Sequence, residues 1–144
     1  MKISTKGRYA LKMLLDLAMH QDNEFVPLKD ISKRQGISKK YLEQIVPLFN
    51  KNGFLLTNRG FQGGYKLART PDKYTVGEIL RLAEGSLSPV ECTGDKSFCS
   101  EYNDCLTLYV WQGLDKVINE YLDSISLQDI IDKHQENFVN NYVI

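Results

Sequence analysis

The feature that most restricts the fold is the order of structural signals in the first 70 residues, where three short amphipathic segments precede a glycine-rich turn. Apolar residues recur at helical spacing from Thr5, a possible N-cap, to about His20. Pro27 suits the first turn of a second helix that runs to about Gln35 and ends at Gly36. The spacing therefore predicts two helices separated by a short polar break.

A third helix is expected from an N-cap at Ser38 to roughly Asn50, with Gly53 closing it. Its apolar side chains should face the core, and they are Tyr41, Leu42, Ile45, Val46 and Phe49. Pro47 lies deep in this segment and has no backbone N–H to donate. We therefore expect a bend or an early end at Pro47.

Two short apolar runs, at 54–57 and 65–67, flank the glycine-rich segment 58–64 and predict a β-hairpin. Thr75 and Glu78 have the spacing of a capping box and begin a short fourth helix. Three helices followed by two strands are typical of a winged helix-turn-helix. The predicted fold is mainly α with a small β-hairpin wing.

The second half of the chain is predicted to hold one irregular loop and one long helix. Residues 86–104 show little periodicity. A helical stripe then follows from Leu106 and consists of Val110, Trp111, Leu114, Val117, Ile118, Tyr121, Leu122 and Ile125. Ser126 and Asp129 indicate a last short helix before a mixed tail. The predicted units are a DNA-binding domain at 1–85, a cysteine-bearing sensor loop at 86–105, and a dimerisation helix with a tail at 106–144.

Charge is distributed unevenly along the chain although its formal net charge is zero. Residues 1–70 contain 13 Lys and Arg against 5 Asp and Glu, and residues 71–144 contain 5 against 13. A basic half is expected of a surface that neutralises phosphates, while an uneven solvated surface is the alternative.

The side chains that a winged helix-turn-helix would present to DNA suit that task. The start of the third helix carries Ser38, Lys39, Lys40, Tyr41, Glu43 and Gln44. Lysine can bind phosphates or purine acceptors, glutamine can pair with adenine, and glutamate can accept from cytosine. At the hairpin tip, Gly60 and Gly63 flank a turn from which Arg59 could enter a narrow minor groove, although any tight hairpin needs such glycines.

Several strings of the sequence resemble the Rrf-type winged-helix regulators, a family with iron-sulfur, nitric-oxide and cysteine-metabolism regulators among its members. The matching strings are Ile3–Leu11, Gly36–Ser38, Tyr41–Gln44, Arg59–Gly60, Gly63–Tyr65 and Cys105–Thr107. The resemblance implies that the stretch with Thr5, Lys6 and Arg8 contacts the DNA backbone. It also implies that Arg59 and Gly60 probe the minor groove and that the long helix forms a homodimer. Two-fold symmetry would then require a pseudo-palindromic operator.

The long apolar helix favours the same role independently. Its stripe could be ordinary core, but the N-terminal segments already supply a core of their own. Pairing with a second copy is therefore the better use of these side chains.

Cys92, Cys99 and Cys105 are the only cysteines and follow a Cys-x6-Cys-x5-Cys spacing. The odd count argues against a disulfide framework, and thiolates suit zinc, an iron-sulfur cluster or a redox switch. The resemblance implies an iron-sulfur cluster of two or four irons, because cluster-binding relatives carry three cysteines in this loop. Where one such relative has a histidine as fourth ligand, this chain has Leu108. The remaining candidates are Asp95, Glu101, Asp104, a residue of the other subunit, or a small molecule.

Other classes of protein are less compatible with the sequence. The N-terminus lacks a signal-peptide pattern and there is no run of about 18 apolar residues, so we expect a cytoplasmic protein without a membrane span. Two histidines and scattered acids assemble no recognisable catalytic set, so we expect no enzyme.

The sequence predicts a transcription repressor with an iron-sulfur sensor. The alternative is a cofactor-free or thiol-switch regulator of cysteine and sulfur metabolism that acts with a partner enzyme.

Overall fold

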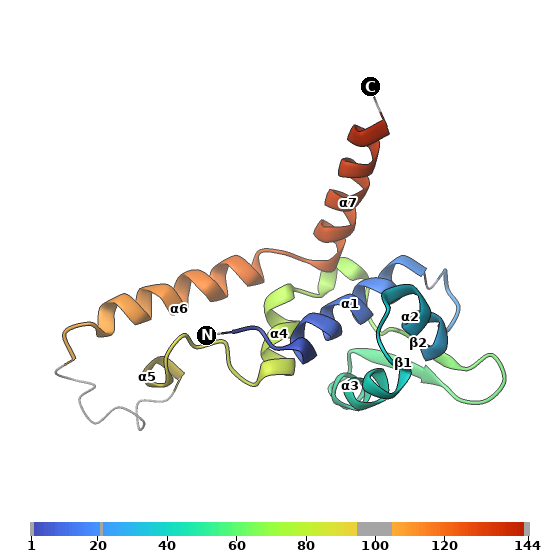
Figure 1. Ribbon diagram of the computed structural model, residues 1–144, viewed down its shortest axis with the longest axis horizontal. Helices are drawn as coiled ribbons and strands as arrows, with labels where there is room; N and C mark the ends of the chain where they lie inside the picture. Colours follow the sequence, from blue (N-terminus) through green and yellow to red (C-terminus); the bar gives the residue numbers. More distant parts are fainter. Residues whose placement is uncertain (1, 21, 95–104, 143–144) are drawn as a thin grey trace.

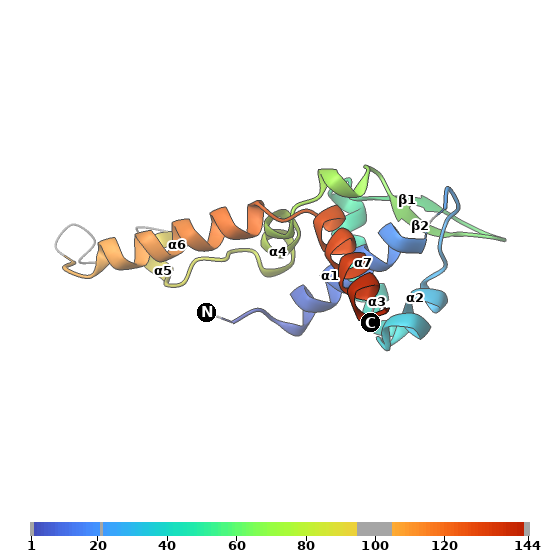
Figure 2. The same ribbon diagram turned by 90° about the horizontal axis from the view of Figure 1, so that it is seen from above.

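The computed structural model describes residues 2–20, 22–94 and 105–142 and is mainly helical with one small hairpin, as predicted (Figure 1). Its elements are α1 (Thr5–His20), α2 (Leu28–Gln35), α3 (Lys39–Lys51), β1 (Leu55–Asn58), β2 (Gly64–Leu67), the 3-10 helix η1 (Pro71–Lys73), α4 (Val76–Glu84), α5 (Glu91–Gly94), α6 (Leu108–Asp123) and α7 (Leu127–Tyr142). Helices α1–α4 and the hairpin form one body, from which α6 and α7 extend in different directions (Figures 1 and 2). In these described stretches, no helix is both long and apolar enough to cross a bilayer.

The core of this body is built around α1 and α3. Each helix buries one face, which consists of Ala10, Met13, Leu14 and Leu17 on α1 and of Leu42, Ile45, Val46 and Phe49 on α3. Leu127, the first residue of α7, is fully buried in the same core. The helical periodicity read from the sequence therefore identified the buried faces of α1 and α3.

Most local signals begin and end the helices where they were expected. Thr5 is an exception, because it is the first residue of α1 and the cap is Ser4, whose hydroxyl accepts the Gly7 N–H at 3.1 Å. Gly36 adopts a left-handed conformation with φ of 65° after α2, and the Ser38 hydroxyl accepts the Tyr41 N–H at 3.1 Å. The Thr75 hydroxyl likewise accepts the Glu78 N–H at 3.0 Å. The Glu78 carboxylate pairs with Arg69 at 3.2 Å. In a complete capping box the same carboxylate would accept the Thr75 N–H, so here a tertiary contact engages that side chain.

The expected early end of α3 at Pro47 is wrong, because the helix continues to Lys51. Proline removes the N–H that would bond the Glu43 carbonyl. Glu43 is exposed, so water can satisfy that carbonyl, and buried Val46 and Phe49 hold the helix on both sides of the proline. Packing therefore overrides the local cost of Pro47.

The hairpin pairs β1 with β2 antiparallel, and Leu55 lies opposite Leu67. Val26 extends its base, because the Val26 N–H donates to the Tyr65 carbonyl at 2.8 Å and the Tyr65 N–H donates back at 2.9 Å. A Cβ on Gly64 would overlap the Val26 carbonyl. Glycine is thus required at position 64 for the close approach of these two backbones.

The C-terminal half departs from the sequence prediction in two places. The loop predicted as irregular contains a short helix, α5, before the described residues break at 94. The last helix is not short, since α7 has 16 residues. The Ser126 hydroxyl accepts the Asp129 N–H at 3.0 Å, and the Asp129 carboxylate accepts the Ser126 N–H at 2.9 Å. This reciprocal cap and the burial of Leu127 start a helix that the sequence pattern indicated only at its beginning.

The apolar stripe predicted on α6 divides into two faces. Ile118 and Leu122 pack against a small cluster that includes Leu80 and Leu87. The helix is shorter than predicted, since α6 begins at Leu108 and ends at Asp123. Ile125 therefore lies in the link to α7, where its carbonyl accepts the Val76 N–H, although its side chain packs against the same cluster. The other side exposes apolar side chains, namely Val110, Trp111, Leu114, Val117 and Tyr121. One stripe in the sequence therefore serves two different surfaces.

A buried ionic contact joins α1 to the end of α2. The Asp16 carboxylate is fully buried and accepts Arg34 Nη2 at 2.7 Å, Arg34 Nε at 3.0 Å and Gln35 Nε2 at 2.9 Å. Hydrogen bonding to this carboxylate raises the pKa of the Arg34 guanidinium above its ordinary value, against the desolvation that lowers it. The contact holds α2 in place immediately before the turn into α3.

Candidate nucleic-acid interface and cysteine segment

The N-terminal part of α3 presents a polar surface above a buried one. Ser38, Lys39, Lys40, Glu43 and Gln44 are exposed. The Lys39 and Glu43 side chains lie 3.9 Å apart, so this lysine and this carboxylate are neighbours on the exposed face. The buried side of α3 fixes the direction in which these polar groups point.

Tyr41 differs from the other residues predicted in this set. It is half-buried, and its ring packs edge-on against Tyr9 of α1 with centroids 5.4 Å apart. Part of Tyr41 is thus occupied by the contact between α1 and α3, and only its remaining surface is open to a ligand.

The start of α1 is held by a residue from α4. The Ser4 N–H and hydroxyl donate to Glu84 Oε1 at 2.9 and 2.6 Å, and the Gly7 N–H donates to the Ser4 hydroxyl at 3.1 Å. A Cβ on Gly7 would overlap Glu84 Oε1, so a larger residue there would displace the Glu84 carboxylate. The predicted contacts Thr5, Lys6 and Arg8 are exposed on this anchored turn.

Glu84 was not found from the sequence. It is separated from Ser4 by 80 positions, and no spacing rule links the two. The one available signal was a glycine in the first turn of a helix, where a residue with higher helix propensity would be usual.

The tip of the hairpin is a tight turn with exposed side chains. The Gly63 N–H donates to the Gly60 carbonyl at 2.9 Å, and Gly60 has a φ of 94°. A Cβ on Gly63 would overlap the Asn58 and Gly60 carbonyls. Both glycines are therefore required by the turn, and Arg59 is exposed beside them.

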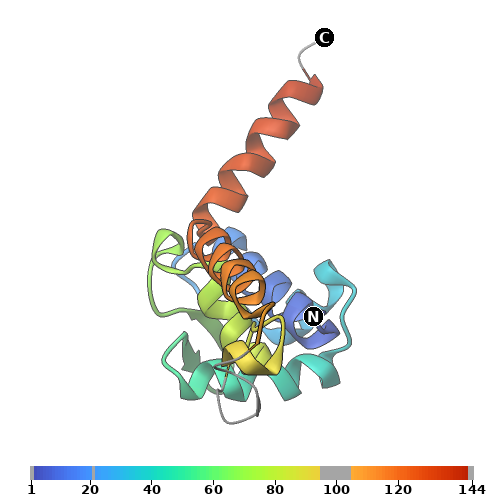
Figure 3. The ribbon, with the colours of Figure 1, turned by 90° about the vertical axis from the view of Figure 1, so that its left-hand side faces the viewer.

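Helix α3 and the hairpin lie on the side of the body opposite to the projecting α7 (Figures 1 and 3). The structure thus brings the exposed start of α3 and the hairpin to one side of the molecule. Such a surface can bind a duplex through phosphate contacts and through base contacts in both grooves.

The cysteine segment lies at the far end of α6. Cys92 belongs to α5 and Cys105 comes just before α6, and both are half-buried. Helix α5 contacts α6, so the two cysteines flank the same end of that helix (Figure 1). Cys105 Sγ lies 3.5 Å from the Thr107 hydroxyl.

Cys99 and the candidate fourth ligands Asp95, Glu101 and Asp104 lie outside the described residues. Within residues 2–20, 22–94 and 105–142, no three His, Cys, Asp or Glu side chains gather as a metal site. Leu108 is half-buried at the first turn of α6 and offers no ligand atom.

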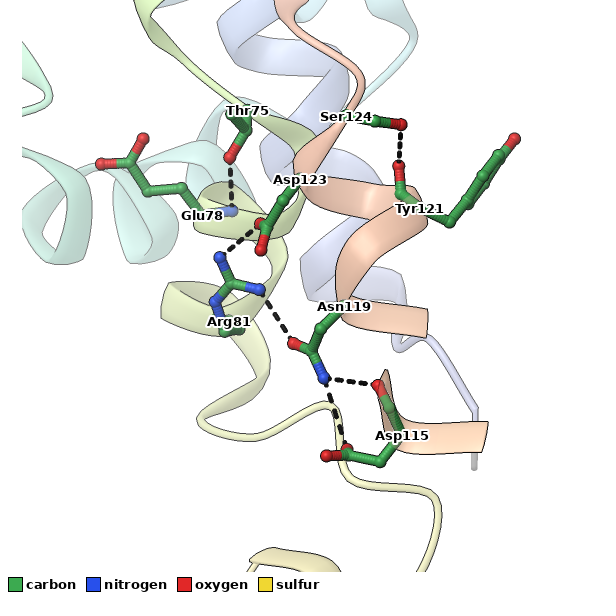
Figure 4. A network of polar contacts seen from close by, with 8 residues as sticks. All are labelled: Thr75, Glu78, Arg81, Asp115, Asn119, Tyr121, Asp123 and Ser124. Atoms are coloured by element: carbon green, nitrogen blue, oxygen red, sulfur yellow. Dashed lines mark hydrogen bonds and ion pairs between the residues drawn. The ribbon is translucent and has the colours of Figure 1, made fainter. Parts of the chain in front are cut away.

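A polar network fixes α6 to α4 (Figure 4). Arg81 Nη1 donates to Asn119 Oδ1 at 2.9 Å, and Arg81 Nη2 contacts Asp123 Oδ1 at 2.5 Å. Gly77 lies against the same network, and a Cβ there would overlap the Asp123 carboxylate and displace it. Arg81 and Glu84 lie one helical turn apart, so α4 contacts both α6 and the start of α1.

The comparisons with known proteins agree with this architecture. The Rrf2 family profile, described as an iron-dependent transcriptional regulator, matches residues 3–133. The chain belongs to the Rrf2 family. As a member of the Rrf2 family it is a DNA-binding transcription regulator, and its relatives are named as regulators and not as enzymes.

Individual relatives cover most of the chain. The chain is 41% identical over 136 residues to the HTH-type transcriptional regulator IscR of Xenorhabdus nematophila, which is 94% of this chain and 82% of the relative. The solved structure of T. potens IscR matches with a TM-score of 0.77 and 40% identity, and covers 95% of this chain and 90% of that one. CymR, the global cysteine regulator of B. subtilis, matches with a TM-score of 0.74 and 35% identity, over 92% and 98% of the two chains. The fold class and the family predicted from the sequence are confirmed.

Proposed function

We propose that this Rrf2-family regulator is a cytoplasmic repressor that binds a pseudo-palindromic duplex as a homodimer and responds to an iron-sulfur cluster held by Cys92, Cys99 and Cys105. The observation that carries the DNA-binding part is the exposed polar start of α3 beside an anchored turn of α1 and a projecting hairpin. The predicted contacts remain Thr5, Lys6, Arg8, Ser38, Lys39, Lys40, Tyr41, Glu43, Gln44, Arg59, Gly60 and Gly63.

The exposed face of α6 supports the homodimer. Val110, Leu114, Val117 and Tyr121 follow an i, i+4, i+7, i+11 spacing, and each is between 40% and 64% exposed. Contiguous apolar side chains on one helix face are typical of a protein interface. A second copy of α6 would cover this stripe and set the distance between the two α3 helices.

The chemistry of the cysteines supports the cluster. Thiolates are the usual ligands of iron-sulfur clusters, and Cys92 and Cys105 lie at the same end of α6. When bound, the cluster would be the group whose presence or redox state changes with iron, oxygen or nitrosative stress. The role of the protein would be to order the segment around 92–105 and to pass that change to α6.

The contacts of α4 support a coupling of this segment to DNA affinity. Arg81 holds α6 at Asn119 and Asp123, and Glu84 holds α1 at Ser4. A movement of α6 relative to the body would therefore act on the anchored turn of α1. A ligand shifts such an equilibrium only by its difference in affinity for the two arrangements.

The likeness to CymR favours a second candidate function. The chain covers 98% of that global cysteine regulator at 35% identity. In this alternative no cluster is bound, and the protein is a cofactor-free or thiol-switch regulator of cysteine and sulfur metabolism that acts with a partner enzyme.

The deciding experiment is an absorbance spectrum, with iron and acid-labile sulfide assays, on protein purified without oxygen. We expect broad absorbance between about 320 and 460 nm from thiolate-to-iron transitions, with matched iron and sulfide. Cys99→Ala should remove it, while Ser86→Ala, an exposed control in the preceding segment, should not. A colourless and iron-free wild-type protein that still binds DNA would favour the cofactor-free alternative.

The predicted DNA contacts are tested by titrating variants against a duplex that the protein selects from a randomised library. Gln44→Ala should cost about 1–3 kcal/mol of binding free energy if the amide pairs with a base. Lys133→Ala, which removes an exposed charge on α7, should bind like the wild type. Equal affinities of the wild type and Gln44→Ala would show that α3 does not read bases through this residue.

A further inference from the structure

The hairpin tip carries an aromatic side chain to which the proposed function gives no role. Phe61 is 94% exposed, the largest exposed fraction among the large apolar side chains of the described residues. A single exposed apolar residue is common in soluble proteins and carries no meaning alone. The backbone that presents Phe61 is what distinguishes it.

That backbone is held in one conformation by contacts that do not involve the Phe61 side chain. Gly60 and Gln62, on either side of it, have φ values of 94° and 61°, and a positive φ is uncommon for a residue such as glutamine. The turn is closed by the bond from the Gly63 N–H to the Gly60 carbonyl. A Cβ on Gly63 would overlap the Asn58 and Gly60 carbonyls, so this turn requires glycine at position 63.

The base of the hairpin is fixed as well. Two backbone hydrogen bonds join Val26 to Tyr65, and Lys66 Nζ lies 4.9 Å from the centre of the Phe25 ring. The hairpin therefore projects from the body, and these contacts hold its base in place (Figure 2). Phe61 is held away from the protein core at the end of this hairpin, and Arg59 precedes it by two residues.

We propose that Phe61 is an apolar wedge that enters the minor groove beside Arg59 and packs against a base step. This inference rests on the proposed DNA binding. Phenylalanine is one of the residues that minor-groove proteins insert between base pairs, and pyrimidine–purine steps unstack most easily. Arg59 would supply the attraction to the electronegative groove, and the Phe61 ring would lose its contact with water there. The result would be a preference for a deformable step without any hydrogen bond to its bases.

Loss of the Phe61 ring and loss of the Arg59 charge should change the salt dependence of DNA affinity differently. Each phosphate or groove charge that is neutralised adds about one to the slope of log affinity against log salt. Arg59→Ala should therefore lower affinity and reduce this slope. Phe61→Ala should lower affinity about tenfold, as expected for loss of one aromatic contact with a base, and leave the slope unchanged.

The test uses the full-length protein and a duplex that the wild type selects from a randomised library, with 2-aminopurine placed at each step contacted by the hairpin. Binding of the wild type should raise the 2-aminopurine fluorescence at one step, and Phe61→Ala should not raise it. Phe61→Leu should retain affinity within about threefold, because leucine is also a wedge residue. Phe138→Ala removes the same atoms from α7 and should bind like the wild type.

The remaining outcomes overturn the inference in distinguishable ways. Phe61→Ala could bind the duplex with wild-type affinity while Arg59→Ala binds it more weakly. The hairpin would then enter the groove without inserting Phe61, and the inference would be wrong. A smaller slope of log affinity against log salt in Phe61→Ala would mean that the substitution had displaced the hairpin and removed Arg59 from the groove. Absence of duplex binding by the wild type would overturn the proposed function and the wedge together. Thermal stability should be the same in Phe61→Ala and wild type, because a side chain that is 94% exposed contributes little to the core.

Discussion

Asparagine in place of Asp16 tests whether the buried contact between α1 and α2 stabilises the folded protein. Three N–H donors converge on the two carboxylate oxygens, two of them on Oδ2 and one on Oδ1. Asparagine keeps the shape but replaces one oxygen by an NH2 group. In its best orientation the amide oxygen takes the place of Oδ2, and the NH2 group then faces Arg34 Nη2, donor against donor.

The expected cost follows from these contacts. Loss of one hydrogen bond to a charged group costs about 1.5–3 kcal/mol, and removal of one partner of a buried ion pair costs about 3–5 kcal/mol. The Arg34 side chain is 34% exposed, so water can solvate part of the guanidinium and lower this cost. We expect Asp16→Asn to lower the free energy of unfolding by about 2–3 kcal/mol, which for a chain of this size lowers Tm by about 8–12 °C.

Urea and thermal unfolding at one fixed protein concentration measure this effect, since the proposed homodimer would make the stability concentration-dependent. Asp132→Asn, on the exposed part of α7, is the matched control and should leave Tm unchanged. A Tm for Asp16→Asn within about 2 °C of the wild type would refute the argument, because it would show that Arg34 loses nothing when its buried partner becomes neutral.

Three other predictions concern local contacts and assembly. Gly64→Ala should destabilise the hairpin, because the added Cβ would overlap the Val26 carbonyl; hydrogen exchange at the Tyr65 amide would then be faster, and unchanged exchange would contradict the close approach. Arg81→Ala should lower the free energy of unfolding by about 1 kcal/mol, since its partners on α6 are partly exposed, and a urea titration without any shift of the midpoint would count against the α4–α6 network. Val117→Glu should dissociate the proposed homodimer by placing a charge in an apolar interface, and an unchanged mass in sedimentation equilibrium would show that α6 is not the interface.

The sequence by itself determined the elements whose signals lie within a few residues. Ser38, Gly36 and Thr75 act at the predicted helix ends, because caps and left-handed turns depend on local backbone geometry. The hairpin was predicted for the same reason, since its turn requires glycine at defined positions. The uneven distribution of charge and the sequence strings that resemble the Rrf-type regulators could also be read without the tertiary structure.

Pairs of residues distant in the sequence were decided only by tertiary structure. Glu84 meets Ser4, and Arg81 meets Asn119 and Asp123, through contacts that no periodicity encodes. The same holds for the division of the α6 stripe, because helical spacing identifies apolar positions but not which neighbour covers them. Pro47 shows the reverse case, in which a strong local signal for a helix end yields to the burial of the residues around it. Local chemistry therefore specified most of the elements but neither α5 nor the length of α7, and long-range packing specified how α4 holds the start of α1 and the C-terminal end of α6 together.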